Sequence, residues 1–284
     1  MADFLIPDDL SAAVIGDPIA HSLSPLMHNA WIEACDSLAD KKAYGKLQVK
    51  ADQLDDFFAA FRASPLVGVN VTVPHKEAVI PYLTRLSPGA KAVGAVNTIL
   101  KQGDDLVGFN TDGIGFLNHL KASAPSWRSD RPVLVIGAGG AARGILHTLL
   151  TTEVPMVMVA NRSIGRANQL VADIGRGRAV DLPMDNLSDA ITGAGLVVNT
   201  TSLGMAGCPP LDLPLDRAGA DTVVYDIVYN PLETDLLKAA NGRGLTTVDG
   251  LGMLIHQGAA AFKIWFGETP DTGDAVRNRL LAAL

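Results

Sequence analysis

A glycine-rich turn between a strand and a helix constrains this chain of 284 residues more than any other feature. The sequence VLVI at 133–136 predicts a buried strand, GAGGAA follows at 137–142, and the residues up to Leu150 predict a helix. Glycines permit a tight turn and a close backbone approach, and free N–H groups at a helix N-terminus bind a pyrophosphate. Such a turn can also be a plain strand–helix connection, but this context favours a dinucleotide site. The candidate contacts are Gly137, Ala138, Gly139, Gly140 and Ala141.

Strands and helices alternate around this turn, whereas the first half of the chain is less regular. Strands are expected at 132–136, 156–160, 196–199, 222–227 and 246–248, with helices at 140–150 and 163–174. This alternation predicts a parallel, doubly wound sheet. In the first half, strands are expected at 12–15, 66–73, 96–100 and 106–109, a hairpin turn at 103–105, and helices from Ser24 and at 54–61. The tail at 250–284 predicts two helices that fold back on the first half, and 124–131 is the best linker candidate.

The end of the second strand of this sheet indicates which dinucleotide binds. An NAD site places an acidic residue there to bind the ribose 2′-hydroxyl. This chain has Asn161, Arg162 and Ser163 instead, with Arg166 one helical turn later. A guanidinium is a planar fork that matches phosphate oxygens, so these arginines favour the 2′-phosphate of NADP over an alternative role as solvated helix-start residues.

Composition and charge exclude several classes of function. The net charge is −7 and the pI is about 5.3, so a nucleic-acid partner, which needs a basic surface, is not expected. The start MADFLIPDDL lacks the basic segment of a signal peptide, and apolar runs stop short of the ~20 residues of a membrane helix. Cys35, expected in a helix core, and Cys208, expected in a loop, lack motif spacing, which fits a reducing, cytoplasmic compartment. The six histidines have no ligand spacing, so no metal site is expected.

Polar residues recur at strand ends and in glycine-rich frames of the first half. Ser22 and Ser24 precede an expected helix; Ser24 alone would be an ordinary N-cap, but together the two hydroxyls could donate to a carboxylate. Lys76 is expected at the start of a helix, where a cation opposes the helix dipole. Asn97 and Asp112 stand near the ends of expected strands. Isolated residues of this kind usually form turns, but their recurrence favours a binding site.

Together, these motifs resemble those of the shikimate dehydrogenase family. They occur in the same order as in the family and extend over nearly the whole chain. The matching stretches in the first half are GDPI at 16–19, HSLSP at 21–25, NVTVP at 70–74, GAVNT at 94–98 and NTDG at 110–113. Those in the second half are 137–143, NRS at 161–163, NTTS at 199–202 and DGLGM at 249–253 with Gln257. Two positions depart from the family pattern: His75 stands where some members have Phe, and Pro88 where others have an acid.

The resemblance implies a role for each matching residue. Ser22 and Ser24 would bind the carboxylate of shikimate, with Tyr229 nearby. The ring hydroxyls would be bound by Thr72, Lys76, Asn97, Asp112 and Gln257. Lys76 and Asp112 would form the catalytic pair, and which of them carries the proton is left open. Ile227, Gly250 and Met253 join the expected cofactor contacts.

The resemblance also implies a two-domain α/β fold. A substrate-binding domain would comprise 1–113 and 250–284, beside a Rossmann-like NADP-binding domain at 114–249. The expected activity is the reversible NADPH-dependent reduction of 3-dehydroshikimate to shikimate. The alternatives are a dual-specificity quinate/shikimate dehydrogenase and, from another class, a non-catalytic sensor that binds shikimate-like acids. Monomer and homodimer both remain open.

Overall fold

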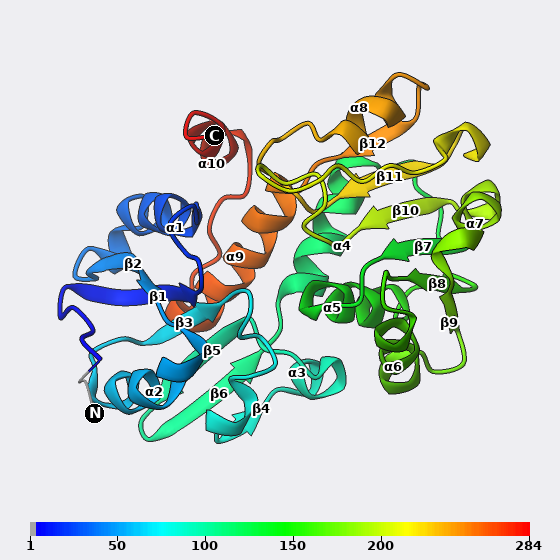
Figure 1. Cartoon of the computed structure of the whole chain (residues 1–284). Coiled ribbons are helices and arrows are strands. Elements are labelled where there is room, and N and C mark those ends of the chain that lie inside the picture. The colour runs from blue at the N-terminus through cyan, green and yellow to red at the C-terminus, as the bar shows by residue number, and fades with distance from the viewer. Residues whose placement is uncertain (1–3) are drawn as a thin grey trace. The chain divides into compact units, whose positions relative to one another are not determined.

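The computed structural model describes residues 4–284, which form two compact units. The first unit comprises the chain up to Thr111 together with Gln257–Ala283, and the second comprises Asp112–His256 with Leu284 (Figure 1). The expected division at 113/114 and 249/250 lies near these borders. In this part of the chain, no helix combines the length and the apolarity that crossing a membrane requires. The segment MADFLIPDDL is not expected to be a signal peptide, and its first three residues lie outside the described part of the chain.

The first unit is built on a mixed six-stranded sheet in the order β2-β1-β3-β5-β6-β4. The strands are β1 (Leu10–Gly16), β2 (Ala43–Gln48), β3 (Gly68–Val71), β4 (Arg85–Leu86), β5 (Thr98–Gln102) and β6 (Asp105–Phe109). Its helices are α1 (Ser24–Glu33), α2 (Leu54–Ala63), α3 (Pro88–Val93), α10 (Asp274–Leu281) and the C-terminal part of α9 (Leu251–Phe266). Short 3₁₀ turns occupy Asp36–Leu38, Ala51–Gln53 and Ile80–Tyr82. β3, β5 and β6 pair antiparallel, which confirms the hairpin expected at 103–105.

Helices pack on both faces of this sheet because successive strand residues point to opposite sides. On one side Ala13 and Ile15 of β1 join the aromatic face of α2, and on the other Ala12 and Val14 join Trp265 of α9. The Trp265 indole N–H donates to the carbonyl of Ile99 at 3.0 Å. The C-terminal tail therefore folds back on the first half of the chain, as expected.

The second unit contains a six-stranded sheet in the order β12-β11-β10-β7-β8-β9, with every pairing parallel. The strands are β7 (Val133–Ile136), β8 (Val157–Ala160), β9 (Ala179–Leu182), β10 (Leu196–Asn199), β11 (Val223–Asp226) and β12 (Thr246–Val248). The helices are α4 (Asp112–Ser123), α5 (Gly140–Leu149), α6 (Ile164–Ile174), α7 (Leu187–Gly193), α8 (Asp235–Asn241) and the start of α9, with 3₁₀ turns at Met184–Asn186 and Leu215–Arg217. This is the doubly wound arrangement that the sequence predicts.

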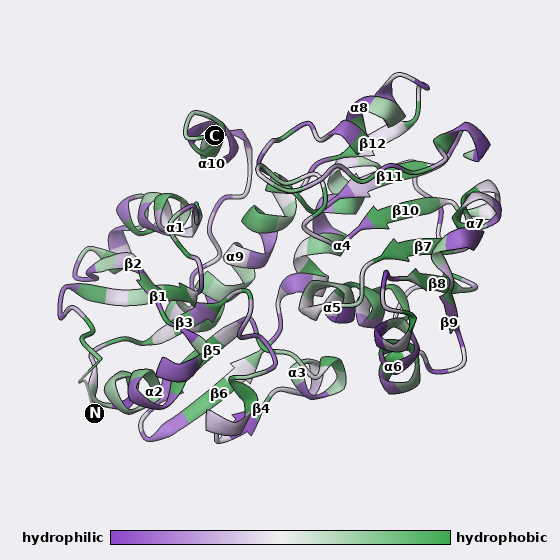
Figure 2. Ribbon diagram, viewed as in Figure 1, coloured by the Kyte–Doolittle hydropathy of each residue, from purple (hydrophilic) through white to green (hydrophobic). Residues whose placement is uncertain are grey.

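Helices cover both faces of the parallel sheet, so its central strands are mostly apolar, as the green of β7 and β10 in Figure 2 shows, and β10 ends at the polar Asn199. Val133 and Val135 pack with α4, α5 and α6, whereas Leu134 and Ile136 pack with α7 and α8. The chain leaves β7 toward β8 on one side and later returns to β10 on the other. In open α/β sheets, ligands bind at the carboxyl ends of strands flanking such a switch point, here β7 and β10.

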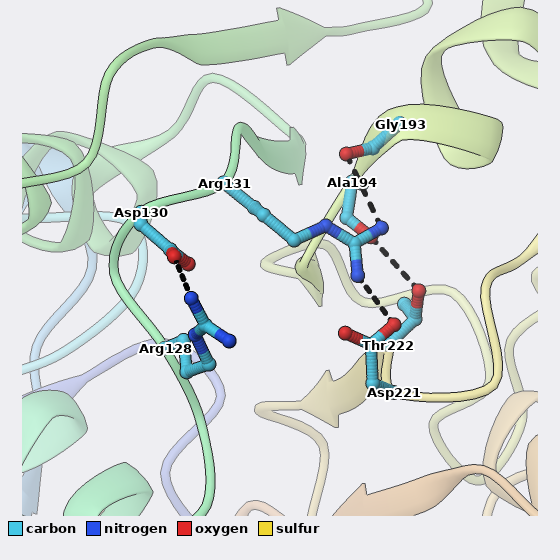
Figure 3. A network of polar contacts seen from close by, with 7 residues as sticks. All are labelled: Arg128, Asp130, Arg131, Gly193, Ala194, Asp221 and Thr222. Atoms are coloured by element: carbon cyan, nitrogen blue, oxygen red, sulfur yellow. Dashed lines mark hydrogen bonds and ion pairs between the residues drawn. The ribbon is translucent and has the colours of Figure 1, made fainter.

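The segment 124–131 is not a linker between the two units, because it lies inside the second one. Ala124 is buried in the core and Trp127 packs against it. Figure 3 shows that Arg131 forms an ion pair with Asp221 and donates hydrogen bonds to the carbonyls of Gly193 and Ala194, at 3.4 and 3.1 Å. The segment has a polar composition that suggested a linker. Its Arg131 instead connects the loops that precede the strands at the amino edge of the parallel sheet.

Three local expectations are wrong. The N-cap of α1 is Leu23, whose carbonyl accepts from Met27 N–H at 3.2 Å, and Ser24 is already helical. Lys76 lies in a turn and begins no α-helix, because its carbonyl accepts from Val96 N–H at 2.7 Å rather than from the residue four positions later. Cys35 is half-buried and follows the end of α1 instead of lying in a helix core.

Candidate functional site

The turn after β7 has a backbone that requires glycine. Gly137 has φ +114°, a conformation that residues with side chains rarely adopt. A Cβ atom at this position would lie 2.4 Å from Thr200 Oγ1, in the loop that follows β10. The Thr200 hydroxyl donates to the carbonyl of Ile136 at 2.7 Å, which holds the two strand ends together. The turn and the β10 loop therefore meet at the switch point.

The residues after Gly137 leave the helix N-terminus accessible. Gly139 is the N-cap of α5, is exposed, and has no atom within 4 Å of an added Cβ in the described part of the chain. No side chain among residues 4–284 caps this helix. Its first N–H groups therefore lack a side-chain cap, and with the partial positive charge of the helix they suit a pyrophosphate.

The end of β8 presents the two predicted arginines to solvent. Arg162 and Arg166 are exposed, and neither guanidinium forms a hydrogen bond or ion pair within residues 4–284. Asn161 donates to the carbonyl of Ser163 at 2.9 Å and shapes the turn that carries them. By contrast, Arg143 on α5 pairs with Asp173 at 2.9 Å. Two available guanidinium groups at a strand end that carries no acidic residue suit a 2′-phosphate.

The loop after β11 approaches the turn that begins α9. A Cβ on Gly250 would lie 2.1 Å from the carbonyl oxygen of Ile227, so only glycine permits this backbone contact. Gly250 N–H donates to the carbonyl of Val228 at 3.2 Å, and Met253 and Ile227 pack in the same core cluster. The structure thus brings Ile227, Gly250 and Met253 together, at the same edge of the parallel sheet as the glycine-rich turn.

A buried carboxylate holds this loop, and the sequence reasoning missed it. Asp226 is fully buried at the end of β11 and accepts hydrogen bonds from Asn199 Nδ2 at 2.9 Å, Val228 N–H at 3.0 Å and Thr234 Oγ1 at 2.7 Å. Burial raises the pKa of Asp226, and these hydrogen bonds oppose that effect. An acid at the end of an otherwise apolar strand is the signal that could have identified it. Tyr229 lies in the loop that Asp226 holds, and burial raises the pKa of its phenol.

The first unit holds the two predicted serines at the start of α1. Ser22 is half-buried and its Oγ accepts a hydrogen bond from Ser24 N–H at 3.3 Å. Because an accepting hydroxyl keeps its own hydrogen, Ser22 can still donate to a ligand. Ser24 is buried on the first turn of α1. The two hydroxyls therefore lie at one helix N-terminus, which suits an anion.

Thr72 and Lys76 are placed by the turn that follows β3. Thr72 N–H donates to the carbonyl of Ile15 at 2.9 Å, and a Cβ on Gly16 would lie 2.5 Å from Thr72 Cγ2, so the glycine at the end of β1 makes room for this threonine. Lys76 is half-buried. His75, one of the departures from the family pattern, is buried, with Nε2 2.6 Å from the carbonyl of Val49. Pro88, the other, begins α3.

Asn97 and Gln257 are joined directly, although 160 residues separate them in the sequence. Asn97 Nδ2 donates to Gln257 Oε1 at 3.2 Å and to Thr111 Oγ1 at 2.9 Å. Asn97 Oδ1 accepts from Thr111 N–H at 2.8 Å. This buried amide connects the edge of the sheet with α9 and with the chain immediately before Asp112, which is the first residue of α4 and is buried.

The predicted substrate contacts are thus distributed over both units. The first unit contains Ser22, Ser24, Thr72, Lys76, Asn97 and Gln257, and the second contains Asp112 and Tyr229. Among residues 4–284, no three His, Cys, Asp or Glu side chains are grouped so that they could hold a metal ion.

The all-parallel sheet with its glycine turn, together with a set of polar side chains held in a second α/β unit, defines a dinucleotide-binding protein of two units. Three family models match successive parts of the chain. "Shikimate dehydrogenase substrate binding domain" matches residues 14–99, "Shikimate / quinate 5-dehydrogenase" residues 120–205, and "Shikimate 5′-dehydrogenase C-terminal domain" residues 250–281. The chain belongs to the shikimate dehydrogenase family.

Curated relatives and solved structures agree with this family. The shikimate dehydrogenase (NADP(+)) of Azorhizobium caulinodans is 45% identical over 273 residues, which is 96% of each chain. That of Rhodospirillum rubrum is 46% identical over 277 residues, 95% of this chain and 96% of its own. Shikimate 5-dehydrogenase from Thermus thermophilus, solved with NADP(H) and shikimate, has a TM-score of 0.85 and 36% identity over 97% of this chain and 100% of its own. Quinate dehydrogenase from Corynebacterium glutamicum, solved with NAD, has a TM-score of 0.84 and 31% identity over 97% of this chain and 100% of its own.

Proposed function

We propose that this chain is an NADP-dependent shikimate dehydrogenase that interconverts 3-dehydroshikimate and shikimate. The observation that carries the proposal is the pair of guanidinium groups of Arg162 and Arg166, which have no partner within residues 4–284 and stand at a strand end without an acid. The chain that carries them is 45% identical to an NADP-dependent shikimate dehydrogenase over 96% of its length. The first unit would supply most of the substrate contacts, and the second would bind the cofactor and add Asp112 and Tyr229 to the substrate contacts. A cytoplasmic location is part of the proposal and fits its two free cysteines.

The residues of this chain would divide the work as follows. Ser22 and Ser24 bind the carboxylate, with Tyr229 beside it, and Thr72, Asn97 and Gln257 bind the ring hydroxyls. The glycine-rich turn binds the pyrophosphate, while Ile227, Gly250 and Met253 supply further cofactor contacts. Bound NADPH supplies the hydride. Lys76 and Asp112 orient the carbonyl oxygen and exchange its proton as a coupled pair.

The quinate alternative is less well supported than shikimate. Quinate carries one more hydroxyl beside its carboxylate, so the surroundings of Ser22, Ser24 and Tyr229 decide between the two substrates. Curated relatives named as shikimate dehydrogenases reach 46% identity, and among solved structures the Thermus thermophilus shikimate enzyme is 36% identical against 31% for the quinate enzyme. Arg162 favours NADP over the NAD of the quinate complex. A measurement of turnover distinguishes the non-catalytic sensor from both enzymes, because a sensor would bind shikimate without oxidising it.

The proposal is tested by following the near-ultraviolet absorbance of the reduced cofactor with the purified protein, with shikimate and quinate each crossed with NADP and NAD. Reduction of NADP by shikimate at a much higher rate than the other three combinations is the expected result. Comparable rates with quinate or NAD would indicate dual specificity. Binding of shikimate without turnover in any combination would make the chain a sensor. Light scattering of the same sample decides between monomer and homodimer.

A further inference from the structure

The first unit contains a buried tyrosine, Tyr44, that has no role in the function described above. Tyr44, on β2, is 2% exposed, and its hydroxyl donates to Asn70 Oδ1 at 2.8 Å. Its backbone is fixed as well: Asn29 Nδ2 donates to the Tyr44 carbonyl at 3.1 Å, and Tyr44 N–H donates to Asn29 Oδ1 at 2.7 Å. A phenol held this firmly at the edge of a sheet can fix the position of whatever its oxygen contacts.

The ring of Tyr44 is placed by α1. His28 stacks on it with ring centroids 4.2 Å apart and an angle of 7° between the planes. His28 is fully buried, burial lowers its pKa to about 3, and neither ring nitrogen has a hydrogen-bond partner among residues 4–284. His28 is therefore a neutral aromatic ring that packs against Tyr44 by stacking. Ser24 lies four residues earlier on the same helix, so it shares the face that packs on Tyr44.

The Tyr44 hydroxyl is a hydrogen-bond donor in this buried site. Burial raises the pKa of the phenol well above its ordinary value, so the hydroxyl keeps its hydrogen. Because Asn70 Oδ1 can only accept, the single hydrogen of Tyr44 goes to Asn70.

On its other side, Tyr44 leads to Asn97 through a continuous series of buried hydrogen bonds. Asn70 Nδ2 donates to Thr98 Oγ1 at 3.1 Å and to the carbonyl of Asn97 at 3.1 Å. Thr98 Oγ1 donates to Asn97 Oδ1 at 3.1 Å, and Asn97 Nδ2 donates to Gln257. In this series, each side chain is oriented by the hydrogen bonds to its neighbours. The orientation of the Asn97 amide therefore depends on that of Asn70.

We propose that Tyr44 is a positioning residue for substrate binding, which holds Asn97 and Gln257 at the hydroxyl end of the site through Asn70 and Thr98. The inference rests on the proposed function, because it assigns Tyr44 to the same substrate site. It adds a residue that does not itself contact the substrate. If Tyr44 had only a structural role, its loss would lower the stability of the first unit and would not change KM for shikimate more than kcat or KM for NADP.

The test is steady-state kinetics of Tyr44→Phe with shikimate and NADP. The substitution keeps the stacked ring but leaves Asn70 Oδ1 without its donor. We expect KM for shikimate to rise about tenfold, as the loss of a buried hydrogen bond predicts. We expect kcat and KM for NADP to stay within about twofold, because the catalytic pair and the second unit are untouched.

Tyr82→Phe is the matched control, since Tyr82 also stacks on an aromatic ring in the first unit, at 4.4 Å from Phe58, and also donates a hydrogen bond, to Asp55 at 2.7 Å. It should leave all three constants unchanged. Thr98→Val interrupts the same series elsewhere and should raise KM for shikimate similarly. The double variant Tyr44→Phe/Thr98→Val should then cost less than the product of the two single effects.

The outcomes separate this inference from the proposed function. An unchanged or lower KM for shikimate in Tyr44→Phe, an equal rise in Tyr82→Phe, or strictly multiplicative effects in the double variant would overturn the role of Tyr44 and leave the function standing. If Tyr44→Phe does not fold, the kinetics of Thr98→Val decide in the same way. Absence of turnover in the wild-type protein would refute the proposed function and this inference with it.

Discussion

The two units prepare their proposed sites in opposite ways. In the first unit, Asn97 is buried and bonded through both atoms of its amide before any ligand arrives. In the second unit, Gly139 and Arg162 are exposed, and the groups offered to a ligand are backbone N–H groups and a solvent-facing guanidinium. A substrate recognised by several hydroxyls needs side chains of fixed orientation. A dinucleotide's phosphates need charge and close backbone approach, which a glycine turn and exposed arginines provide.

The largest effect is expected at the residues proposed to carry out the chemistry. Lys76→Ala should lower kcat about 10²–10⁴-fold, as expected for loss of a proton-transfer residue, and change KM for shikimate far less. Lys91→Ala removes an exposed lysine of α3 in the same unit and should have no effect. A raised KM with a normal kcat would reduce Lys76 to a binding residue.

The next largest effect should be confined to one cofactor. Arg162→Ala and Arg166→Ala should each raise KM for NADP about 10–100-fold, because each removes charge-assisted hydrogen bonds to a phosphate, and should leave KM for NAD almost unchanged. Arg128→Ala, at an exposed arginine of the same unit paired with Asp130, is the control. Equal losses with both cofactors would mean that these arginines do not read the 2′-phosphate.

A smaller effect concerns the buried carboxylate of the second unit. Since the folded pKa of Asp226 lies above its ordinary value of 3.8, the ionised form is disfavoured by folding, and its contribution to stability falls as pH rises from about 3.8 to the folded pKa. Asp226→Asn lacks this titration. In urea unfolding followed by circular dichroism, the free energy of unfolding of the wild type relative to Asp226→Asn should therefore be lower at pH 7 than at pH 4. A difference that grows with pH would show that the hydrogen bonds outweigh burial.

The smallest effect should be structural only. Arg131→Ala removes the hydrogen bonds to the carbonyls of Gly193 and Ala194 at the amino edge of the parallel sheet, at the opposite end of the strands from the glycine turn (Figure 3). Ala194 O keeps the hydrogen bond from Thr222 Oγ1 at 2.8 Å, so the loss should be only about 1 kcal/mol in the free energy of unfolding. The kinetic constants should not change. An altered KM for NADP would show that the two edges of the sheet are coupled.

The second unit could be predicted from sequence more completely than the first. β7 and β8 are short apolar runs, which sequence identifies readily, and β12 begins and ends where expected. The edge strands β2 and β9 escaped prediction because each combines apolar with polar or charged residues and forms no continuous apolar run. Long-range hydrogen bonds also lie outside what local patterns can predict: Val96 N–H donates to the carbonyl of Lys76, which lies in a turn instead of the expected helix.

The candidate site shows the same division. The glycine turn and the arginines after β8 are visible in sequence because a local motif carries each. Asn70 and Asp226 were not recognised, since their importance arises from partners far away in the chain, such as Tyr44 and Asn199. A polar residue inside a fully buried strand, as at Asn70 in β3, is the signal that would have found them.

The most direct test of the proposed division between the units is a crystal structure of the protein with NADP and shikimate bound together. We expect the 2′-phosphate on Arg162 and Arg166, the pyrophosphate on the turn that starts at Gly137, and the shikimate carboxylate on Ser22 and Ser24. A 2′-phosphate away from both arginines, or a carboxylate away from both serines, would contradict the assignment of cofactor and substrate to the two units.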